Sequence, residues 1–347
     1  MVLDCGGGTV DITMHRVERR QPLRVVEMRE PSGGPWGSTY VDLEFEHFVE
    51  KLIGEDNWRR FKPSSAWLDL MKAWEERKLT FNPADYQDDD AMPVRINLSA
   101  LITDGILGGQ TLQECVNRYN QSEGGNLTLK RGTTLLMPAV QVTSFFTQII
   151  NKIVHHVKEL IEETPVKYIY LVGGFAESAI LQERVKCVES SGGPRVIIPM
   201  RPQLMVVKGA VIFGIQKGSA IQSRIARYTY GFETLLRYDA WDPEHVRRGF
   251  KEYTKLGVTT KYVRGADKFM PLVTQGTRIR VSEEHIARGY HTVHDNQTQV
   301  TFNLYVSTSA TATFCDDKGV KKIGQVTVNC AGGQTSDISM SFGTTEL

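Results

Sequence analysis

The sequence has no hydrophobic run long enough to cross a membrane. Its longest apolar runs, such as Tyr168 to Val172, fall far short of the roughly 20 residues that a membrane helix needs. The first residues, Met1 to Cys5, carry no Lys or Arg and therefore do not resemble a secretory signal. We expect a cytoplasmic protein without a transmembrane segment.

The sequence also has no excess of charge of either sign. Its 41 Lys and Arg residues balance 40 Asp and Glu residues, which gives a formal net charge of +1. A nearly neutral chain offers no general attraction to nucleic acids or to anionic membranes. We therefore expect no nucleic-acid partner.

Cysteine is scarce and shows no metal-binding or disulfide pattern. The five cysteines are an odd number, and none stands in a C-x-x-C pair. This favours reduced thiols over a disulfide or zinc framework. Cys5 stands beside three glycines, whose N–H groups would lower the pKa of the thiol and make it prone to oxidation. An ordinary thiol is the alternative.

The first two-thirds of the chain alternates strand and helix patterns. Short strands at 3–4 and 10–14 flank the glycine triplet, and the apolar run 168–172 is typical of a strand buried on both faces. Apolar residues recur at three- and four-residue steps between Pro138 and Glu163, which predicts a long amphipathic helix. Further helices are expected at 40–53, from Ser64 or Ser65 to Lys78, at 176–189 and at 203–216. This alternation indicates an α/β layered domain.

The pattern changes near residue 218. Apolar and polar residues alternate over 300–306 and 338–342, with turn residues between such runs and no convincing amphipathic helix. This indicates an antiparallel β-sandwich. We therefore divide the chain into an α/β domain at 1–217, with an upper subdomain at about 46–130, a linker at 218–227 and a β-domain at 228–347.

The residues from Asp4 to Asp11 (D-C-G-G-G-T-V-D) carry the most specific chemistry. Three glycines allow backbone N–H groups to approach an anion closely, and Thr9 can place its hydroxyl on a terminal phosphate. Asp4 and Asp11 flank the turn and could hold hydrated Mg²⁺, which prefers carboxylate, water and phosphate oxygens. The alternative is a flexible glycine turn. The flanking strands and paired carboxylates favour the phosphate site.

A second glycine pair, Gly173 and Gly174, stands between the strand 168–172 and the next helix. Such a corner can bring backbone against a ribose or an α-phosphate, with the helix dipole attracting the anion. Neither the P-loop pattern nor the G-x-G-x-x-G fingerprint occurs in the sequence. The nucleotide-binding interpretation therefore depends on the two glycine motifs together.

In this order, the two motifs resemble the phosphate-2 and adenosine motifs of the actin-like ATPase superfamily. Within it the chain resembles the seventy-kilodalton heat-shock chaperone family, and most closely that family's divergent 12A and 12B branch. The resemblance rests on segments 4–11, 32–37 (S-G-G-P-W-G), 41–43 (V-D-L), 75–78 (E-E-R-K), 173–179 (G-G-F-A-E-S-A) and 208–211 (K-G-A-V). It implies an α/β actin-like (ribonuclease H-like) ATPase lobe followed by an all-β sandwich-like domain. Segment 228–234 (Y-T-Y-G-F-E-T) is similar to the first strand of the family's peptide-binding sandwich.

The resemblance also implies cofactors and roles for individual residues. The cofactors are ATP or ADP with Mg²⁺. Asp4 and Asp11 would lie near the metal, through water, and near the attacking water, so that with Thr9 they form the catalytic side. Glu75 and Lys78 would grip ribose and adenine, for which a solvated helix face is the alternative. The phosphates would contact Gly6, Gly7, Gly8 and Thr9, and the nucleoside would lie over Gly173 and Gly174.

The sequence departs from the family pattern in ways that bear on catalysis. The chain begins at the phosphate-2 strand, so the first lobe, with its phosphate-1 hairpin and catalytic Lys, is expected to be absent. Leu79 and Gln203 stand where conventional members carry an Arg and an Asp, and Phe175 either stacks on the base or belongs to the core. Because phosphoryl transfer needs charges on several sides of the phosphate, we expect negligible ATP hydrolysis by this chain alone.

For the function we expect ATP-regulated binding of protein clients or signalling partners. The alternative is a non-enzymatic interaction module, a pseudo-ATPase, on the same fold. A sugar or acetate kinase on this fold is disfavoured by the β-domain. Arg224 and Arg227 make the linker unlike the acidic, apolar linker of conventional members. Exposed surfaces of a truncated protein would favour self-association.

Overall fold

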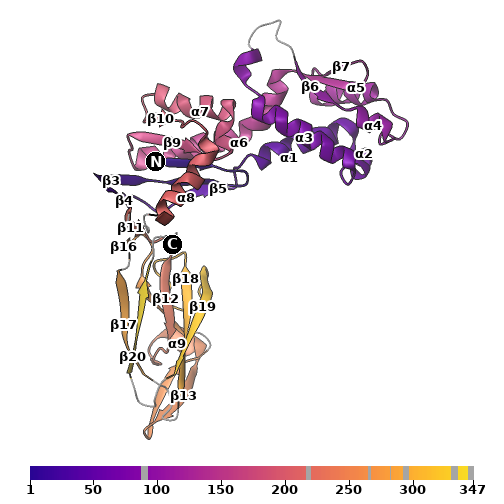
Figure 1. The fold of residues 1–347 in the computed structure, drawn as a ribbon. Helices are drawn as coiled ribbons and strands as arrows, with labels where there is room; N and C mark the ends of the chain where they lie inside the picture. The colour runs from indigo at the N-terminus through magenta and orange to yellow at the C-terminus, as the bar shows by residue number, and fades with distance from the viewer. Residues whose placement is uncertain are drawn as a thin grey trace. The chain divides into compact units, whose positions relative to one another are not determined.

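The structure is a computed structural model, and it divides into two units. Figure 1 shows the ribbon. The structure describes residues 1–86, 93–215, 220–264, 267–281, 283–291, 297–329 and 335–342. Unit 1 comprises Met1–Thr13 and Ser32–Ile212, and unit 2 comprises Met14–Pro31 and Phe213–Leu347. Outside the described residues lie positions 87–92 and 216–217 of the predicted α/β domain, 218–219 of the predicted linker, and 265–266, 282, 292–296, 330–334 and 343–347 of the predicted β-domain.

Unit 1 is built on a five-stranded sheet with the order β10-β9-β1-β2-β5. Its strands are β1 (Val2–Cys5), β2 (Val10–Thr13), β5 (Ser32–Gly34), β9 (Tyr168–Val172) and β10 (Arg195–Ile197). β1 pairs antiparallel with β2 and parallel with β9. Tyr168 and Tyr170 of β9 are exposed, so the expectation of a strand buried on both faces is wrong. The run is amphipathic because the tyrosine hydroxyl can hydrogen-bond to water at the exposed positions.

The long helix α6 (Ala139–Glu163) confirms the three- and four-residue apolar period. It begins directly after Pro138, and Pro165 follows its end. Eight of its apolar side chains are buried along one stripe. The helices α7 (Ala179–Ser190) and α8 (Met205–Ile215) confirm the other two predicted helices of this region, with starts two or three residues later.

The remaining helices of unit 1 pack around an aromatic core. They are α1 (Thr39–Ile53), α2 (Glu55–Phe61), α3 (Ser65–Thr80), α4 (Ser99–Thr103) and α5 (Leu112–Glu123), beside a small sheet of β6 (Val94–Asn97), β8 (Thr134–Met137) and β7 (Thr128–Lys130). Ser64 caps α3 by accepting the Trp67 N–H, as predicted. Phe45 of α1 stacks on Trp74 of α3 with ring centroids 4.2 Å apart. This stacking fixes α1 against α3.

Unit 2 contains a sheet in which an early hairpin pairs with a much later strand. The order is β16-β11-β4-β3, formed by β3 (His15–Arg20), β4 (Leu23–Glu27), β11 (Ile221–Ile225) and β16 (Arg278–Arg280). The segment predicted as a linker thus forms strand β11. The buried carboxylate of Glu27 accepts the Ile225 N–H at 2.8 Å and pairs with Arg224 at 3.5 Å. The ion pair compensates the charge of Glu27, which is buried at the end of β4.

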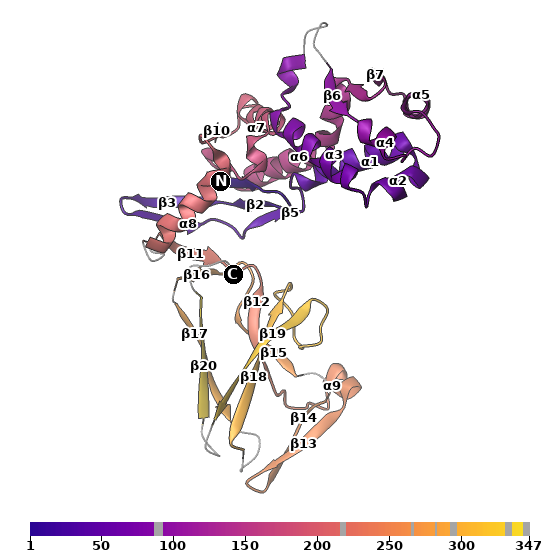
Figure 2. The same ribbon diagram turned by 45° about the vertical axis from the view of Figure 1, so that its right-hand side comes forward.

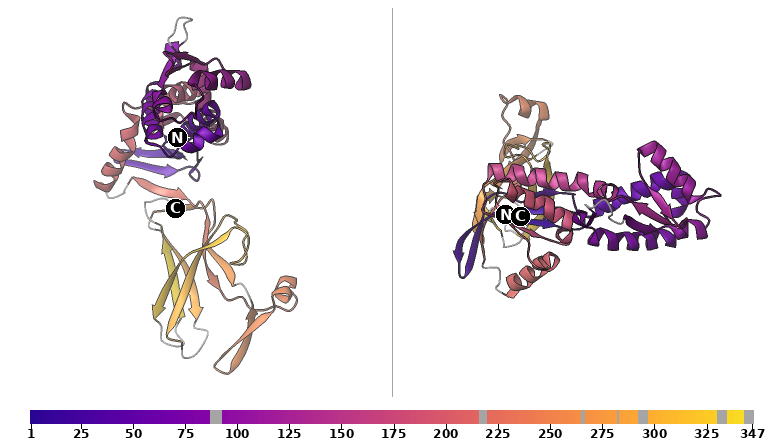
Figure 3. Two further views of the ribbon diagram at one scale, coloured as in Figure 1. Left: turned by 90° about the vertical axis from the view of Figure 1, so that its right-hand side faces the viewer. Right: turned by 90° about the horizontal axis from the view of Figure 1, so that it is seen from above.

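The rest of unit 2 is mainly antiparallel β-structure (Figure 2). One sheet has the order β15-β12-β18-β19, and β17–β20 forms a separate antiparallel pair. These strands are β12 (Thr229–Thr234), β15 (Lys268–Val273), β17 (Glu284–His291), β18 (Gln299–Ser307), β19 (Val320–Asn329) and β20 (Thr335–Ser341). A further hairpin, β13 (Phe250–Lys255) with β14 (Val258–Val263), stands apart from the main sheet in Figure 3. The short helix α9 (Pro243–Arg248) precedes it, contrary to the expectation of no helix, because Asp242 caps the chain just before Pro243.

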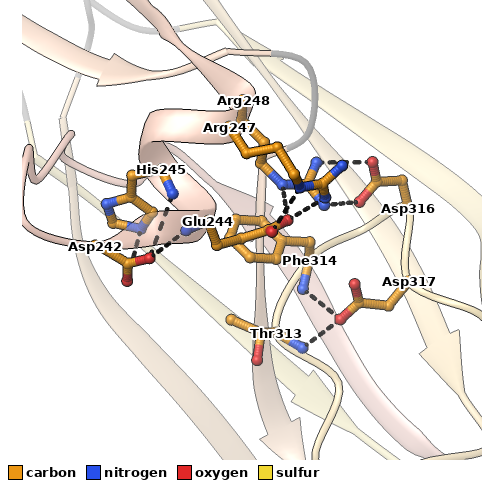
Figure 4. Close-up of polar contacts among 9 residues, drawn as sticks. All are labelled: Asp242, Glu244, His245, Arg247, Arg248, Thr313, Phe314, Asp316 and Asp317. Atoms are coloured by element: carbon orange, nitrogen blue, oxygen red, sulfur yellow. Dashed lines mark hydrogen bonds and ion pairs between the residues drawn. The ribbon is translucent and has the colours of Figure 1, made fainter.

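A cluster of polar contacts fixes α9 to the loop at 313–317 (Figure 4). Both guanidinium nitrogens at the end of Arg248 bind the Asp316 carboxylate, at 2.8 and 3.0 Å, and its Nε donates to Glu244 at 2.6 Å. The guanidinium also lies 4.1 Å from the ring centroid of Phe314. Asp317 accepts the N–H groups of residues 313 and 314 and so holds the loop. We call this set the Arg248 clamp.

We predict that Arg248→Ala destabilises unit 2 by about 1–2 kcal/mol. The variant loses a two-pronged carboxylate contact and a cation–π contact from a side chain that is only 11% exposed. Arg247 is the matched control because its side chain is 68% exposed and, among the described residues, pairs with Glu244 alone. Thermal unfolding should show a lower melting temperature for Arg248→Ala and no change for Arg247→Ala. Equal melting temperatures for the two variants would contradict the clamp.

Candidate functional site

The glycine loop joins β1 and β2 as a tight hairpin, as the sequence predicts. The Gly6 N–H donates to the Thr9 carbonyl at 2.9 Å, and Asp4 lies directly opposite Asp11 in the ladder. Directly opposed residues of antiparallel strands place their side chains on the same face. The hairpin therefore brings two carboxylates together at the base of the loop.

The two residues before α1 and the first residue of the helix hold the loop. The N–H groups of Gly37, Ser38 and Thr39 donate to the carbonyls of the three loop glycines at 2.8–3.2 Å. The Thr39 hydroxyl donates to the Gly7 carbonyl as well, at 2.9 Å. Within the described residues, the N–H groups of Gly7 and Gly8 have no hydrogen-bond partner. The loop thus uses its carbonyls for folding and leaves two donors exposed.

The structure does not need glycine at two of the three loop positions. A Cβ built on Gly7 or Gly8 would meet nothing within 4 Å, and neither residue has a positive φ. Gly37 is different, because a Cβ there would overlap the Gly7 carbonyl. The glycines at 7 and 8 therefore keep open a space beside exposed N–H donors, as a bound anion requires.

Neither packing nor pairing compensates the carboxylate of Asp4. It is half-buried, and among the described residues it has no hydrogen bond or ion pair. Burial raises its pKa, and the negative charge of Asp11 raises it further. Asp11 is exposed and accepts a 2.9 Å hydrogen bond from the Thr9 hydroxyl. Uncompensated acidic pairs of this kind are found mainly at functional sites.

The second glycine motif lies against the first. Gly173 follows β9 with a φ of 93°, and a Cβ there would overlap Asp4 and the Cys5 carbonyl. Only glycine fits, since both the backbone angle and the close approach exclude a side chain. Gly174 faces open space, and the neighbouring Phe175 is buried. Phe175 therefore belongs to the core and does not stack on a ligand.

Cys5 is an unreactive core residue, so the interpretation of a thiol with a lowered pKa is wrong. Its side chain is fully buried, on the same face of β1 as the buried Leu3. Burial raises the pKa of the thiol, and the charges of Asp4 and Asp11 raise it further.

Glu75 and Lys78 form part of an internal ion cluster. Lys78 is only 4% exposed, so the alternative of a solvated helix face is wrong for it. Its Nζ lies 2.9 Å from both oxygens of Asp42 and 2.6 Å from Glu75. The Trp74 indole N–H donates to Asp42 at 2.8 Å. Asp42 was not among the predicted site residues, and its partners on α3 lie 32 and 36 residues away.

This cluster is connected to the glycine loop through α1. Asp42 lies one turn after Thr39, whose N–H and hydroxyl bind the Gly7 carbonyl. A change at Lys78 can therefore alter the orientation of α1 and the loop that it holds. Whether Lys78 and Glu75 contact a ligand stays a prediction.

The site offers two carboxylates and no larger ligand cluster. In the described part of the chain, no three His, Cys, Asp or Glu side chains lie close enough together to hold a metal ion. A pair of carboxylates suits a metal that keeps most of its water and takes oxygens from a phosphate.

No helix in the described part of the chain is long and apolar enough to cross a membrane.

The comparisons with known proteins define the class first. No family model matches the sequence. Its curated relatives are heat-shock proteins of the 70 kDa class, and the chain spans about half of their length. The particular relatives are human heat shock 70 kDa protein 12B, 31% identical over the whole chain and 51% of that protein, and human and mouse heat shock 70 kDa protein 12A, each 30% identical over the same shares. The chain is a homologue of the 12A and 12B proteins, which confirms the resemblance.

Two solved structures are similar to a smaller degree. One is a pCBH ParM non-polymerisable quadruple mutant, with a TM-score of 0.32 and 13% identity over 62% of this chain and 46% of that one. The other is a Bacillus thuringiensis ParM hybrid with ADP, with a TM-score of 0.26 and 10% identity over 84% of this chain and 30% of that one. TM-scores this low do not assign a fold.

We predict opposite stability effects for two glycine substitutions in and beside the loop. Gly37→Ala forces the Gly7 carbonyl to move and should cost about 1–3 kcal/mol. Gly7→Ala enters open space at an ordinary backbone angle and should be neutral or stabilising by up to about 1 kcal/mol. Thermal unfolding of both variants tests this, and a destabilised Gly7→Ala would show that the loop is packed against something.

We also predict that Asp4→Asn stabilises the protein at neutral pH. The raised pKa means that ionised Asp4 destabilises the folded state. This cost is absent below the unfolded pKa of about 3.9 and complete above the raised folded pKa. The melting temperature of Asp4→Asn should exceed that of the parent at pH 7.5 and equal it below pH 4. Glu76→Gln, which neutralises an exposed carboxylate on α3, should change neither value.

Proposed function

We propose that unit 1 binds ATP or ADP, with the phosphates at the glycine loop. The observation that carries the proposal is the space at Gly7 and Gly8, which lies beside two N–H donors and is required by no part of the fold. The overlap of Gly173 with Asp4 supports it, because the second glycine motif then borders the same site. Homology to the heat-shock relatives favours a nucleotide over other anions.

The residues present fit a magnesium nucleotide. The N–H groups of the loop would hold the phosphates, and Asp4 and Asp11 would hold hydrated Mg²⁺ through its water molecules. When bound, the metal would neutralise phosphate charge and relieve the repulsion that raises the Asp4 pKa. The Thr9 hydroxyl, which donates to Asp11, keeps its oxygen lone pairs for a water or a metal-bound water.

The role of the whole protein is a further part of the proposal. It is nucleotide-regulated binding of protein clients or signalling partners in the cytoplasm, with self-association as one form of partner binding. We propose little or no ATP hydrolysis by this chain alone, since the described site supplies donors and carboxylates but no cation directed at the phosphates. The alternative is a non-enzymatic interaction module. The complete pairing of Lys78 within the protein favours that alternative, because a lysine held by two carboxylates is not available to a ligand without rearrangement.

The test is calorimetric titration of the purified chain with Mg-ATP. We expect binding at micromolar concentration, and we expect Asp11→Asn and Thr9→Ala to weaken it at least tenfold. Gly7→Ala should fold normally yet also weaken binding, because its methyl group enters the phosphate space. Lys321→Glu, on an exposed part of β19, is the control and should bind as the parent does.

Two results would contradict the nucleotide proposal. The first is a folded parent chain that shows no heat of binding at millimolar Mg-ATP. The second is a Gly7→Ala variant with parental affinity, since that would remove the observation on which the proposal depends.

A further inference from the structure

The sheet of β3, β4, β11 and β16 is strongly basic, although the whole chain is nearly neutral. Its four strands contain seven arginines and two glutamates, with no lysine and no aspartate. The sheet therefore concentrates positive charge in one part of unit 2. The nucleotide and partner binding proposed above make no use of this charge.

Part of the charge is neutralised within the sheet. Glu27 pairs with Arg224, and Glu18 pairs with Arg16 at 3.1 Å. Arg278 donates a hydrogen bond to the backbone carbonyl of Glu27 at 2.7 Å. Both glutamates of the sheet are thus engaged, and neither is available to the remaining arginines.

The β3–β4 hairpin carries arginines whose charge is not neutralised (Figure 1). Arg19 and Arg20 are exposed and have no hydrogen bond or ion pair among the described residues. Arg24 donates a hydrogen bond to the Gln222 side chain at 2.9 Å, but a neutral amide leaves the charge of the guanidinium in place. We call residues 16–24 the arginine hairpin.

Two of these arginines lie opposite one another in the hairpin. Arg19 of β3 is directly paired with Arg24 of β4. Directly opposed side chains of an antiparallel pair lie on the same face, with Cβ atoms roughly 5 Å apart, and like charges in that position are destabilising. A phosphate shared by the pair removes the repulsion, because a planar guanidinium can donate two parallel hydrogen bonds to its oxygens. The pair therefore suits a phosphate-bearing ligand.

Exposed apolar side chains lie beside the arginines. Leu23 is directly opposite Arg20 and is 50% exposed, and Val17 is 54% exposed. An exposed leucine gains by entering the acyl boundary of a bilayer, while the guanidinium of a neighbouring arginine stays at the level of the lipid phosphates. An anionic lipid surface thus satisfies both kinds of side chain.

Two features of the hairpin disfavour other polyanions. β3 is the last strand of its sheet, but a register shift between Val17 and Arg19 interrupts it, and such a shift and charged side chains both hinder the addition of a further strand. An extended acidic peptide would therefore gain few main-chain hydrogen bonds. Residues 15–27 contain no Phe, Tyr or Trp, so the hairpin lacks the stacking surfaces that hold single-stranded nucleic acids.

We propose that the arginine hairpin binds the surface of membranes that contain anionic phospholipids. The lipid phosphates bind Arg19, Arg20 and Arg24, and Leu23 enters the interface. Attachment of this kind is reversible, because each arginine near the surface contributes only about fivefold in affinity. The inference goes beyond the proposed nucleotide and partner binding and depends on neither.

The experiment is a sedimentation assay of the full chain with phospholipid vesicles. One set of vesicles is pure phosphatidylcholine, and the other contains about 30% phosphatidylserine. At about 100 mM salt we expect the chain to bind the anionic vesicles at least tenfold more tightly. At about 500 mM salt most of this difference should disappear, because salt screens exposed arginines.

Charge reversal locates the attachment. Arg19→Glu/Arg24→Glu should weaken binding to the anionic vesicles at least tenfold. The matched control is Lys318→Glu/Lys321→Glu, which reverses two exposed cations outside the hairpin and should change the affinity less than twofold. Equal melting temperatures of the variants and the parent establish that folded proteins are compared. If the arginine double variant does not fold, Arg20→Glu replaces it and should weaken binding about threefold.

A further variant separates insertion from charge. Leu23→Ala keeps every charge and should weaken binding to the anionic vesicles about threefold, because less apolar surface enters the bilayer. Leu68→Ala changes another exposed leucine, on α3, and should bind as the parent does. Parental affinity of Leu23→Ala would contradict the insertion of this side chain.

Four outcomes would overturn the inference: no binding to either kind of vesicle, equal binding to both kinds, parental affinity of the arginine variant, or displacement from the vesicles by polyglutamate or a single-stranded oligonucleotide at a lower concentration of charge than by competing vesicles of the same composition. Titration of the same sample with Mg-ATP separates the two proposals. Nucleotide binding without membrane binding would contradict only the role of the hairpin, and the reverse would contradict only the nucleotide site.

Discussion

The hydrogen bonds between the start of α1 and the glycine loop are the constraint on which unit 1 depends. Three successive N–H groups, from Gly37 to Thr39, reach the three loop carbonyls. The first turn of a helix always has N–H groups without an intrahelical partner, and here loop carbonyls accept from Thr39, the first residue of α1, and from the two residues before it. The same contacts orient the loop, because a peptide group whose carbonyl points toward α1 directs its N–H the other way. One set of bonds thus completes a helix start and prepares an anion site.

The buried ion cluster around Asp42 extends this arrangement into the helical part of the unit. A buried lysine is costly unless its charge is met, and Lys78 is met by two carboxylates. The indole of Trp74 adds a third donor–acceptor contact to Asp42 while its ring stacks on Phe45. Polar and aromatic contacts therefore hold α1 and α3 at the same place. Any ligand that drew Lys78 away would have to replace both carboxylates.

Local patterns in the sequence predicted those features that depend on neighbouring residues. The β1–β2 hairpin, the Ser64 cap and the long α6 each have their signal within a few residues, and each is present. The apposition of Gly173 and Asp4 was also predictable. Asp4 lies in β1 and Gly173 directly follows β9, and a parallel sheet places these two strands side by side. The helix α9 also has a local signal, the cap-and-proline pair Asp242 and Pro243.

Features that depend on partners distant in the sequence could not be predicted from local patterns. The burial of Lys78 depends on Asp42, 36 residues earlier, and the parallel pairing of β1 depends on β9, more than 160 residues later. A linker pattern at 218–227 gave no indication of a strand, since β11 forms only by pairing with β4 and β16. Sequence periodicity shows which face of an element is apolar, but not which element covers it.

The pairing of β4 with β11 has a consequence for how the chain is made. Glu27 and Ile225, which share a hydrogen bond, are separated by 198 residues. During synthesis the β3–β4 hairpin leaves the ribosome long before β11 exists, and β4 then has an unpaired edge. Unit 1 can complete its own sheet in that interval, since β10 precedes β11 in the chain. The early hairpin is therefore the segment of the nascent protein with the longest exposure to other strands, and the one for which help from a chaperone matters most.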